Sequence, residues 1–125
     1  MSPTLTLQLV GRHPTLLSLP NGSVIAQRGI ECSDGWYGLI DKTLSEIEGR
    51  RVSVDSSPPA ITQIKEKFGL LRVYTMPSDE PIRAILDAAE QASATCCEQC
   101  GREGKLVATP FSQVRCENCL GRNAS

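Results

Sequence analysis

The sequence is poor in aromatic residues and has a single histidine. Aromatic side chains make up 4% of the 125 residues, and they are Trp36, Tyr37, Phe68, Tyr74 and Phe111. We therefore expect a mainly aliphatic core of modest size, of the kind that small domains often supplement with a bound metal. The one histidine, His13, lies far along the chain from the cysteines. Catalysis by a histidine beside a nucleophile or a metal is therefore not predicted.

The sequence also lacks long apolar runs and an excess of either charge. No run approaches the roughly 20 apolar residues of a membrane-spanning helix, and residues 1–10 lack the basic and apolar regions of a secretory signal. The 13 basic and 14 acidic residues give a net charge of −1. A protein that holds duplex nucleic acid through its phosphates usually carries a basic excess. These absences favour a cytoplasmic protein that does not contact membranes.

Four of the six cysteines form two Cys-x-x-Cys pairs near the C-terminus. Cys97 and Cys100 form the first pair, and Cys116 and Cys119 form the second, with 15 residues between the pairs. A two-residue spacer lets both thiolates of a pair reach one ion, so the pattern predicts a tetrahedral zinc site. Gly101 allows the positive φ that such a turn needs. Four thiolates leave no position open for water, which predicts one structural Zn²⁺ and not a catalytic one.

The two remaining cysteines are predicted to lie outside the zinc site. Cys96 is out of register with the two-residue spacing, although competition with Cys97 for the ion is the alternative. Cys32 is expected to be a small buried hydrophobic residue. The alternative of a redox Cys-x-x-Cys would need a thioredoxin-like βαβ context, which the sequence does not show. The sequence has neither a glycine-rich phosphate loop nor a nucleophile with a histidine to serve it, so no enzyme is predicted.

An amphipathic helix is predicted at residues 35–48. Its inward-facing side chains recur every three or four positions, and they are Trp36, Leu39, Ile40, Thr43, Leu44 and Ile47. Either Ser33 or Asp34 is expected to cap the first turn, because a short oxygen-bearing side chain accepts a hydrogen bond from a free amide there. Gly49 is a typical residue for the end of a helix.

A β-hairpin and a second helix are predicted to follow. Residues 61–68 and 70–75 are rich in strand-forming residues, with a turn predicted near Phe68 and Gly69. Alternation along the first strand places Ile64 and Phe68 on one face. The second helix is expected to begin after Ser78 as its cap and to end near Thr95, with an inner stripe of Ile82, Ile85, Leu86, Ala89 and Ser93.

The predicted fold class is therefore α+β, with three parts. Residues 1–30 form an N-terminal part, in which the alternation of Thr4–Leu9 and the segment Ser23–Gln27 predict short strands; the region is either a small hairpin or a loosely packed arm. Residues 31–95 form an α-β-β-α body with a small antiparallel sheet. Residues 96–125 form a zinc ribbon or a treble-clef-like module, packed on the end of the second helix.

Basic residues on the predicted hairpin are candidates for contact with a partner. Lys65 and Lys67 lie on the outer face of one strand, and Arg72 lies beside Tyr74 on the outer face of the next. Together with Arg115 in the zinc module, they are suited to an acidic protein surface or to phosphates. An ordinary solvated sheet face is the alternative interpretation.

Three stretches carry a resemblance to a known group of proteins. They are Glu31-Cys-Ser-Asp-Gly-Trp-Tyr-Gly-Leu-Ile-Asp41, Gln63-Ile-Lys-Glu-Lys-Phe-Gly-Leu-Leu-Arg72, and the segment from Ala89 into the two cysteine pairs. In these stretches the chain resembles a family of small uncharacterised proteins from bacteriophages, prophages and their bacterial hosts. The family pattern has a second glycine in place of Leu70, a cysteine in place of Leu44 and a tryptophan in place of Phe111.

The resemblance implies a phage or mobile-element origin and a zinc-bearing body, with the ligands at the four paired cysteines. Cys96 falls at a usual threonine position of the family, and no activity is implied. The resulting hypothesis is a small, non-enzymatic, zinc-stabilised interaction protein. It would bind a host protein in the host cytoplasm and inhibit a host or defence function. The alternative is a nucleic-acid-binding accessory protein that uses the basic residues of the hairpin and of the zinc module.

Overall fold

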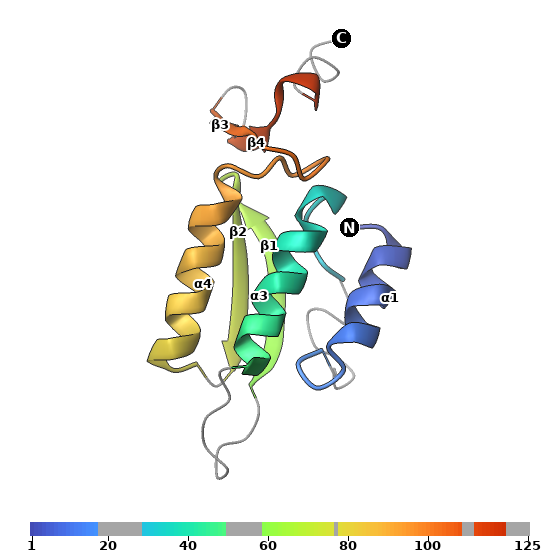
Figure 1. Cartoon of the computed structure of the whole chain (residues 1–125), viewed down its shortest axis with the longest axis vertical. Helices are drawn as coiled ribbons and strands as arrows, with labels where there is room; N and C mark the ends of the chain where they lie inside the picture. Colours follow the sequence, from blue (N-terminus) through green and yellow to red (C-terminus); the bar gives the residue numbers. More distant parts are fainter. Residues whose placement is uncertain (18–28, 50–58, 77, 109–111, 120–125) are drawn as a thin grey trace.

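The structure is a computed structural model that describes residues 1–17, 29–49, 59–76, 78–108 and 112–119. Its elements, in chain order, are α1 (Pro3–Arg12), η1 (Asp34–Trp36), α3 (Tyr37–Gly49), β1 (Ala60–Lys67), β2 (Leu70–Met76), α4 (Glu80–Ser93), β3 (Lys105–Val107) and β4 (Gln113–Arg115) (Figure 1). Within the described ranges the strands form two antiparallel pairs, β1–β2 and β3–β4. The predicted α+β class is confirmed, with four cysteines clustered after the second helix of the body.

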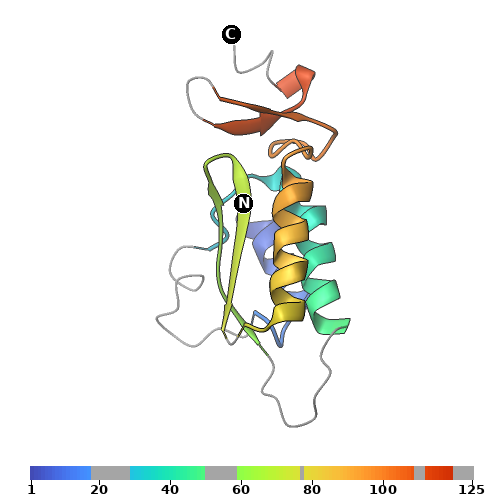
Figure 2. The ribbon, with the colours of Figure 1, turned by 90° about the vertical axis from the view of Figure 1, so that its left-hand side faces the viewer.

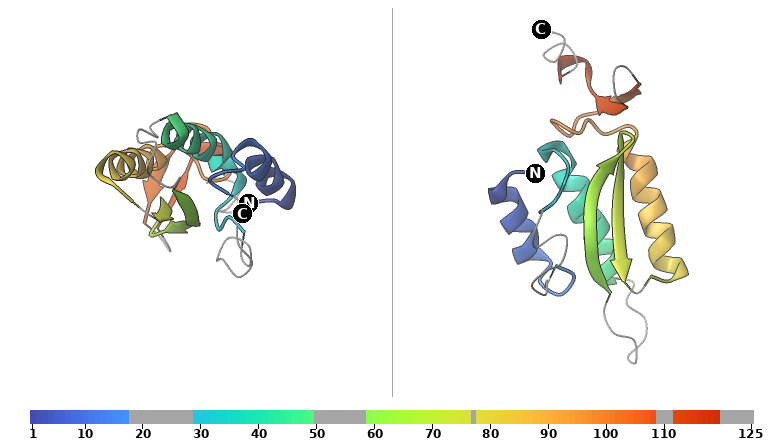
Figure 3. Two further views of the ribbon diagram at one scale, coloured as in Figure 1. Left: turned by 90° about the horizontal axis from the view of Figure 1, so that it is seen from below. Right: turned by 180° about the vertical axis from the view of Figure 1, so that it is seen from behind.

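The three helices lie on the same side of the β1–β2 hairpin. Figure 3 shows α4 and α3 over one face of the two strands, with α1 beside α3 and past the edge of the hairpin. The main core fills the space between these layers and includes Leu9, Trp36, Ile40, Leu44, Ile61, Ile64, Leu71 and Ile85. The β3–β4 pair lies beyond the tip of the hairpin, past the end of α4 (Figure 2). The cysteines are therefore carried at one end of the body.

The predicted first helix is confirmed, but its predicted cap is wrong. The chain enters through the 3₁₀ turn η1 and continues as α3. Of the predicted stripe, Trp36, Ile40, Thr43, Leu44 and Ile47 are buried and Leu39 is half-buried. Ser33 precedes the turn without a side-chain capping bond. The Asp34 carboxylate instead accepts a hydrogen bond of 2.8 Å from the backbone N–H of Ser2. This carboxylate therefore holds the start of the chain and does not cap the helix.

The predicted hairpin is also confirmed, whereas the predicted position of Phe68 is wrong. Phe68 and Gly69 form a two-residue turn with φ values of 54° and 86°, which matches the twist of the flanking strands. Ile64 is buried, as expected for the inner face. Phe68 does not share that face, because it belongs to the turn and not to the strand, and 74% of it is exposed.

Helix α4 has the predicted inner stripe and a different cap. Of the predicted stripe, Ile82, Ile85, Ala89 and Ser93 are buried and Leu86 is half-buried. The cap is Asp79 and not Ser78, because the Asp79 side chain accepts the backbone N–H of Ile82 at 2.9 Å. At the other end, the Ser93 hydroxyl accepts the backbone N–H of Leu71 at 3.0 Å. This bond joins the end of α4 to β2, directly before the chain enters the cysteine pairs.

The predicted strand at Thr4–Leu9 is wrong, because these residues belong to α1. The Ser2 hydroxyl caps the helix by accepting the backbone N–H of Leu5 at 3.2 Å, and Pro3 occupies the first turn. Leu5 and Leu9 would lie on the same face of a strand, because their separation of four is a multiple of the strand period of two. Residues four apart also lie on one face of a helix, so this spacing fits both structures. The helix buries Leu9 completely and leaves Leu7 71% exposed. The second predicted strand, Ser23–Gln27, lies outside the described residues.

A cluster of charged side chains fastens α1 to α3. His13, which caps α1, is 2% exposed; its Nδ1 lies 2.7 Å from Glu48 Oε1, and its Nε2 lies 2.7 Å from Asp41 Oδ1. Both ring nitrogens of His13 therefore face carboxylate oxygens of α3. Arg12 also donates to Asp41, at 2.8 Å. Hydrogen bonds from Arg12 and then His13 lower the pKa of Asp41, although partial burial opposes the shift.

The lowered pKa of Asp41 predicts a stabilising contribution that disappears in acid. A carboxylate with a depressed folded-state pKa stabilises the fold above its unfolded pKa of about 3.9 and loses this effect as the pH falls through the folded value. The Asp41→Asn variant should therefore show a flatter dependence of the unfolding free energy on pH below about pH 4 than the wild type. Urea denaturation across this range measures the difference. Glu46→Gln, an exposed change on the same helix, is the control, and parallel curves for Asp41→Asn and wild type would contradict the prediction.

Candidate metal centre

The structure brings together the four cysteines that the spacing predicts. The Sγ atoms of Cys97, Cys100, Cys116 and Cys119 all lie within 4.8 Å of one another, and those of Cys100 and Cys116 are 3.5 Å apart. Sulfurs about 2.3 Å from a tetrahedral ion are about 3.8 Å apart. Three of the cysteines are buried and Cys100 is exposed. The group can therefore hold one metal ion with little rearrangement.

Two tight turns position the sulfurs. In the first, Gly101 has a φ of 81°, as its place after the second cysteine predicts, and its N–H donates to the Cys97 carbonyl at 2.8 Å. In the second, the chain leaves β4 at Cys116 and makes a short helical segment, in which the Cys119 N–H donates to Cys116 Sγ at 3.4 Å. The antiparallel pairing of β3 with β4 brings the second cysteine turn beside the first.

The backbone around the site favours thiolates at particular positions. Burial raises the pKa of Cys97, but hydrogen bonds from the backbone amides of Cys116, Cys100 and Gln99 outweigh it and lower the value to about 6. The Cys119 amide likewise lowers the pKa of Cys116. Burial and the neighbouring sulfurs raise the pKa of Cys119 to about 12. Four thiolates this close repel one another, and a bound cation would offset that repulsion.

The other two cysteines lie outside the group, as predicted. The Cys96 thiol donates weakly to the carbonyls of Gly35 and Gly101, at 3.8 and 3.7 Å. The Cys96 side chain therefore connects Gly101 of the first cysteine turn with Gly35 of the body. Cys32 is buried in the main core, and this burial raises the pKa of its thiol to about 12. Neither thiol is activated as a nucleophile.

Glu98 is the main residue of the site that the sequence did not reveal. Although it lies between two of the paired cysteines, it is only 7% exposed. Its Oε2 accepts the backbone N–H of Ser33 at 2.9 Å, and its Oε1 lies 3.5 Å from Arg115 Nη1. One carboxylate therefore connects the first cysteine turn both to the body and to β4. A glutamate between cysteines usually indicates an exposed position, so no sequence signal pointed to this role.

The first cysteine turn is packed directly on the start of the body's first helix. The backbone N–H of Gly35 donates to the Glu98 carbonyl at 2.7 Å. A Cβ at Gly35 would lie 2.3 Å from the Cys97 carbonyl oxygen, so only glycine fits there. The fully buried Trp36 donates its Nε1–H to the Cys96 carbonyl at 2.8 Å. The cysteine module, residues 96–108 and 112–119, is thus fixed to the body by backbone contacts.

Replacing Glu98 with alanine should destabilise the protein by about 3 kcal/mol, because Arg115 would remain buried without its carboxylate. The Arg115 side chain is 11% exposed, and the change also removes the acceptor for Ser33. Denaturant unfolding monitored by Trp36 fluorescence measures the loss. Glu117 is the matched control, because it also follows the first cysteine of a pair but is exposed. Equal effects of Glu98→Ala and Glu117→Ala would refute the role given to Glu98.

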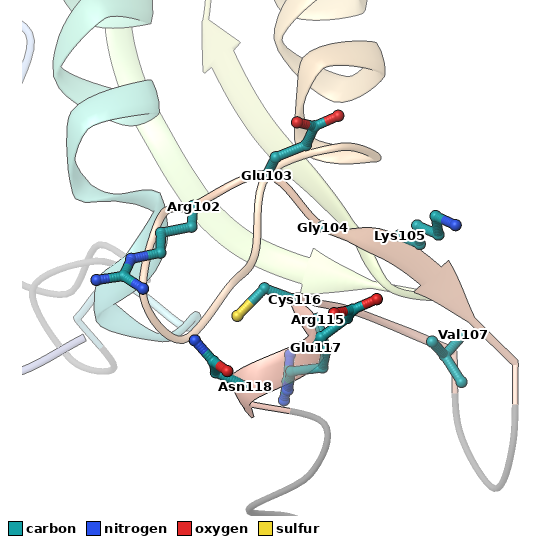
Figure 4. A pocket seen from close by; sticks show the side chains of 9 residues that line it. All are labelled: Arg102, Glu103, Gly104, Lys105, Val107, Arg115, Cys116, Glu117 and Asn118. Atoms are coloured by element: carbon teal, nitrogen blue, oxygen red, sulfur yellow. The ribbon is translucent and has the colours of Figure 1, made fainter.

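A pocket of about 440 Å³ lies beside the cysteine group. Its lining includes Arg102, Lys105 and Arg115, but also Glu103 and Glu117. Figure 4 shows the side chains of Arg102 and Lys105 extending to opposite sides of the pocket. In a phosphate site, basic side chains converge on one point. Arg102 and Lys105 do not converge in this pocket (Figure 4).

The four basic residues predicted to contact a partner fall into two groups. Arg72 pairs with Glu90 of α4 at 2.7 Å, and Arg115 is mostly buried against Glu98. Lys65 lies opposite Arg72 in the hairpin, and Lys67 is exposed beside the turn. Neither lysine has an ion pair within the part of the chain that the structure describes. The two lysines are therefore the available members of the predicted set.

Comparisons of the chain with protein-family models, with curated proteins and with solved structures find no match. Among the helices of the described ranges, none is both long and apolar enough to cross a membrane. Function must therefore be inferred from the geometry of the site itself. That geometry consists of the four converging cysteine sulfurs, the buried Glu98 carboxylate that joins the first cysteine turn to the body, and the pocket beside the cysteine group.

Proposed function

We propose that the chain binds one structural Zn²⁺ through Cys97, Cys100, Cys116 and Cys119, and that it acts as a non-enzymatic interaction module. The observation that carries the metal assignment is the group of four sulfurs within 4.8 Å. Soft thiolates select zinc or iron over hard cations such as magnesium and calcium. Zinc with four thiolates has no open position for a substrate or water. The metal would therefore hold the cysteine module in shape and take no part in a reaction.

The environment of His13 supports a non-enzymatic role. Both of its ring nitrogens face carboxylates at 2.7 Å, and its side chain is 3% exposed. A general base must reach the proton that it removes, and this imidazole is already engaged on both sides. The closed sulfur set argues in the same direction, because catalytic zinc sites keep one coordination position for water.

The proposed partner is a host protein, and the proposed origin is a phage or prophage. On this hypothesis the protein binds a host protein in the host cytoplasm and inhibits a host or defence function. The ion pairs of Arg72 and Arg115 support a protein partner over nucleic acid, because they leave few free basic groups for phosphates. The alternative, a nucleic-acid-binding accessory protein, would use Lys65 and Lys67 with the exposed Arg102 and Lys105.

Affinity purification from a nuclease-treated bacterial lysate tests this function. The bait is the metal-loaded chain at several salt concentrations, and a specific protein should be retained at physiological ionic strength. A gel-shift assay with duplex DNA and with RNA at low salt runs in parallel, and it should show no complex. Retention of no protein partner, together with a salt-sensitive shift of DNA or RNA, would replace the proposed function by the alternative.

A further inference from the structure

The turn of the β1–β2 hairpin holds Phe68 in a strained backbone conformation. Its side chain is exposed, so burial does not offset this strain. Phe68 has a φ of 54° and is 74% exposed. A bulky side chain is a genuine outlier in this left-handed region, where glycine or asparagine adopts the same turn with less strain. The Nζ of Lys67 lies over the Phe68 ring, 5.8 Å from its centroid. The stability of the turn therefore does not account for phenylalanine at this position.

The backbone beneath Phe68 is held firmly. The Glu66 carboxylate accepts the backbone N–H of Gly69 at 2.6 Å. Gly69 is itself packed against the cysteine module, because a Cβ there would lie 2.7 Å from Leu106 Cδ1 and 2.9 Å from the Ser112 carbonyl carbon. Figure 2 shows the tip of the hairpin directly beneath β3 and β4. The aromatic ring therefore projects from a fixed base, which lowers the entropy cost of using it in binding.

The surface around this ring is shared by the two parts of the molecule. Leu106, on β3 of the cysteine module, lies against the turn and is 49% exposed. Lys67 from the body is exposed and has no ion pair within the described ranges. An apolar centre with a charged rim is the usual arrangement of a protein interface. The surface exists in this form only when the cysteine module is folded and docked.

We infer that this composite surface, Phe68 and Leu106 with Lys67, is the docking site for the partner, and the inference rests on the proposed function. The partner is a protein with an apolar pocket that accepts the Phe68 ring and has aspartate or glutamate at its border. Charge complementarity supports this choice, since Lys67 borders the apolar centre and has no ion pair within the described ranges. Nucleic acid is less favoured, because the chain has a net charge of −1 and the surface has a single exposed ring.

Site-specific photo-crosslinking tests the location of the surface. The photoreactive residue p-benzoylphenylalanine replaces Phe68 in one protein and Leu7 in a control, since these side chains are 74% and 71% exposed. Leu7 lies on α1, away from the cysteine module (Figure 1). In a nuclease-treated bacterial lysate, the Phe68 position should give a discrete crosslinked protein and the Leu7 position should not. An excess of wild-type chain should suppress the product, whereas an excess of Phe68→Gly should not.

The Phe68→Gly variant separates binding from folding. Glycine relieves the strain at this φ, so the variant should retain its metal and be at least as stable as the wild type. Its affinity for the crosslinked protein should nevertheless fall by more than about tenfold, as for an interface anchor. A destabilised variant would identify Phe68 as a structural residue and overturn the inference. Unchanged affinity for the partner would also overturn it, while leaving the proposed function intact.

Two further outcomes are decisive. If oligo(dT) binds the wild type and not Phe68→Gly, the ring stacks on a nucleobase, and both the inferred partner and the proposed function are wrong. If no protein is crosslinked from either position and none is retained in the affinity purification, the proposed function fails and the inference fails with it.

Discussion

Replacing Cys116 with serine should release the metal and unfold the cysteine module. A serine hydroxyl is a far poorer zinc ligand than a thiolate, and binding of structural zinc contributes about 10–16 kcal/mol to the folding of small zinc modules. Strands β3 and β4 have three residues each. A two-stranded pair of this length is not stable alone in water. The variant should therefore lose both its zinc and the protection of the β3–β4 amides from hydrogen exchange.

The body should survive this change, because it has its own core. The buried cysteines form a cluster separate from the main core around Trp36 and Ile64. Trp36 fluorescence should nonetheless change, since its indole N–H donates to the Cys96 carbonyl. Cys96→Ser is the matched control, because it alters a neighbouring thiol outside the sulfur group. It should keep one zinc per chain by native mass spectrometry. Zinc retained by Cys116→Ser, or lost by Cys96→Ser, would show that the ligands are wrongly assigned.

Replacing Gly35 with alanine should cost about 3 kcal/mol, at the upper end of the range for overpacking a well-packed site. The added Cβ would lie 2.3 Å from the Cys97 carbonyl oxygen and 2.4 Å from that of Glu98. Both atoms belong to the backbone of the first cysteine turn, so no side-chain rotation relieves the clash. The Gly35 N–H is also bonded to the Glu98 carbonyl, which prevents an easy shift. The module should be displaced from the body.

Gly38 provides the control for this prediction. It lies in α3, is exposed, and a Cβ there would meet nothing within 4 Å. Gly38→Ala should therefore be neutral, or stabilise the helix by about 0.5–1 kcal/mol. Both variants retain all four ligand cysteines, so both should bind zinc. Denaturant unfolding gives the two free energies, and similar stability of Gly35→Ala and Gly38→Ala would contradict the docking described here.

The parts of the fold that the sequence predicted are those with a local signal. The cysteine set follows from its spacing, because the two-residue spacer fixes the geometry of each pair. The stripe of α3 and the strands on either side of Gly69 follow from periodicity. The N-terminal helix was missed because Leu5, Leu7 and Leu9 satisfy the strand period, and the Leu5–Leu9 spacing satisfies the helix period as well. Burial of Leu9 against the body decided between them.

The remaining errors and omissions depend on contacts between residues far apart in the chain. Asp34 was expected to cap a helix, but its carboxylate binds the backbone of Ser2. The role of Glu98 requires Ser33 and Arg115, which belong to other segments. The exposure of Phe68 follows from a first strand that ends at Lys67, one residue earlier than predicted. The position of the turn beneath β3 follows from the docking of the cysteine module. No single stretch of sequence contains this information.

The most direct test of the central claim is the coordination of the metal in the purified chain. Zinc K-edge X-ray absorption of the protein as isolated should show one zinc with four sulfur neighbours at about 2.3 Å and no nitrogen or oxygen in the first shell. This result would establish a closed, structural site that supports the docking surface. A first shell containing nitrogen or oxygen would contradict it, because at least one of the four cysteines would then not bind the metal and the argument from a closed set of four sulfurs would no longer hold.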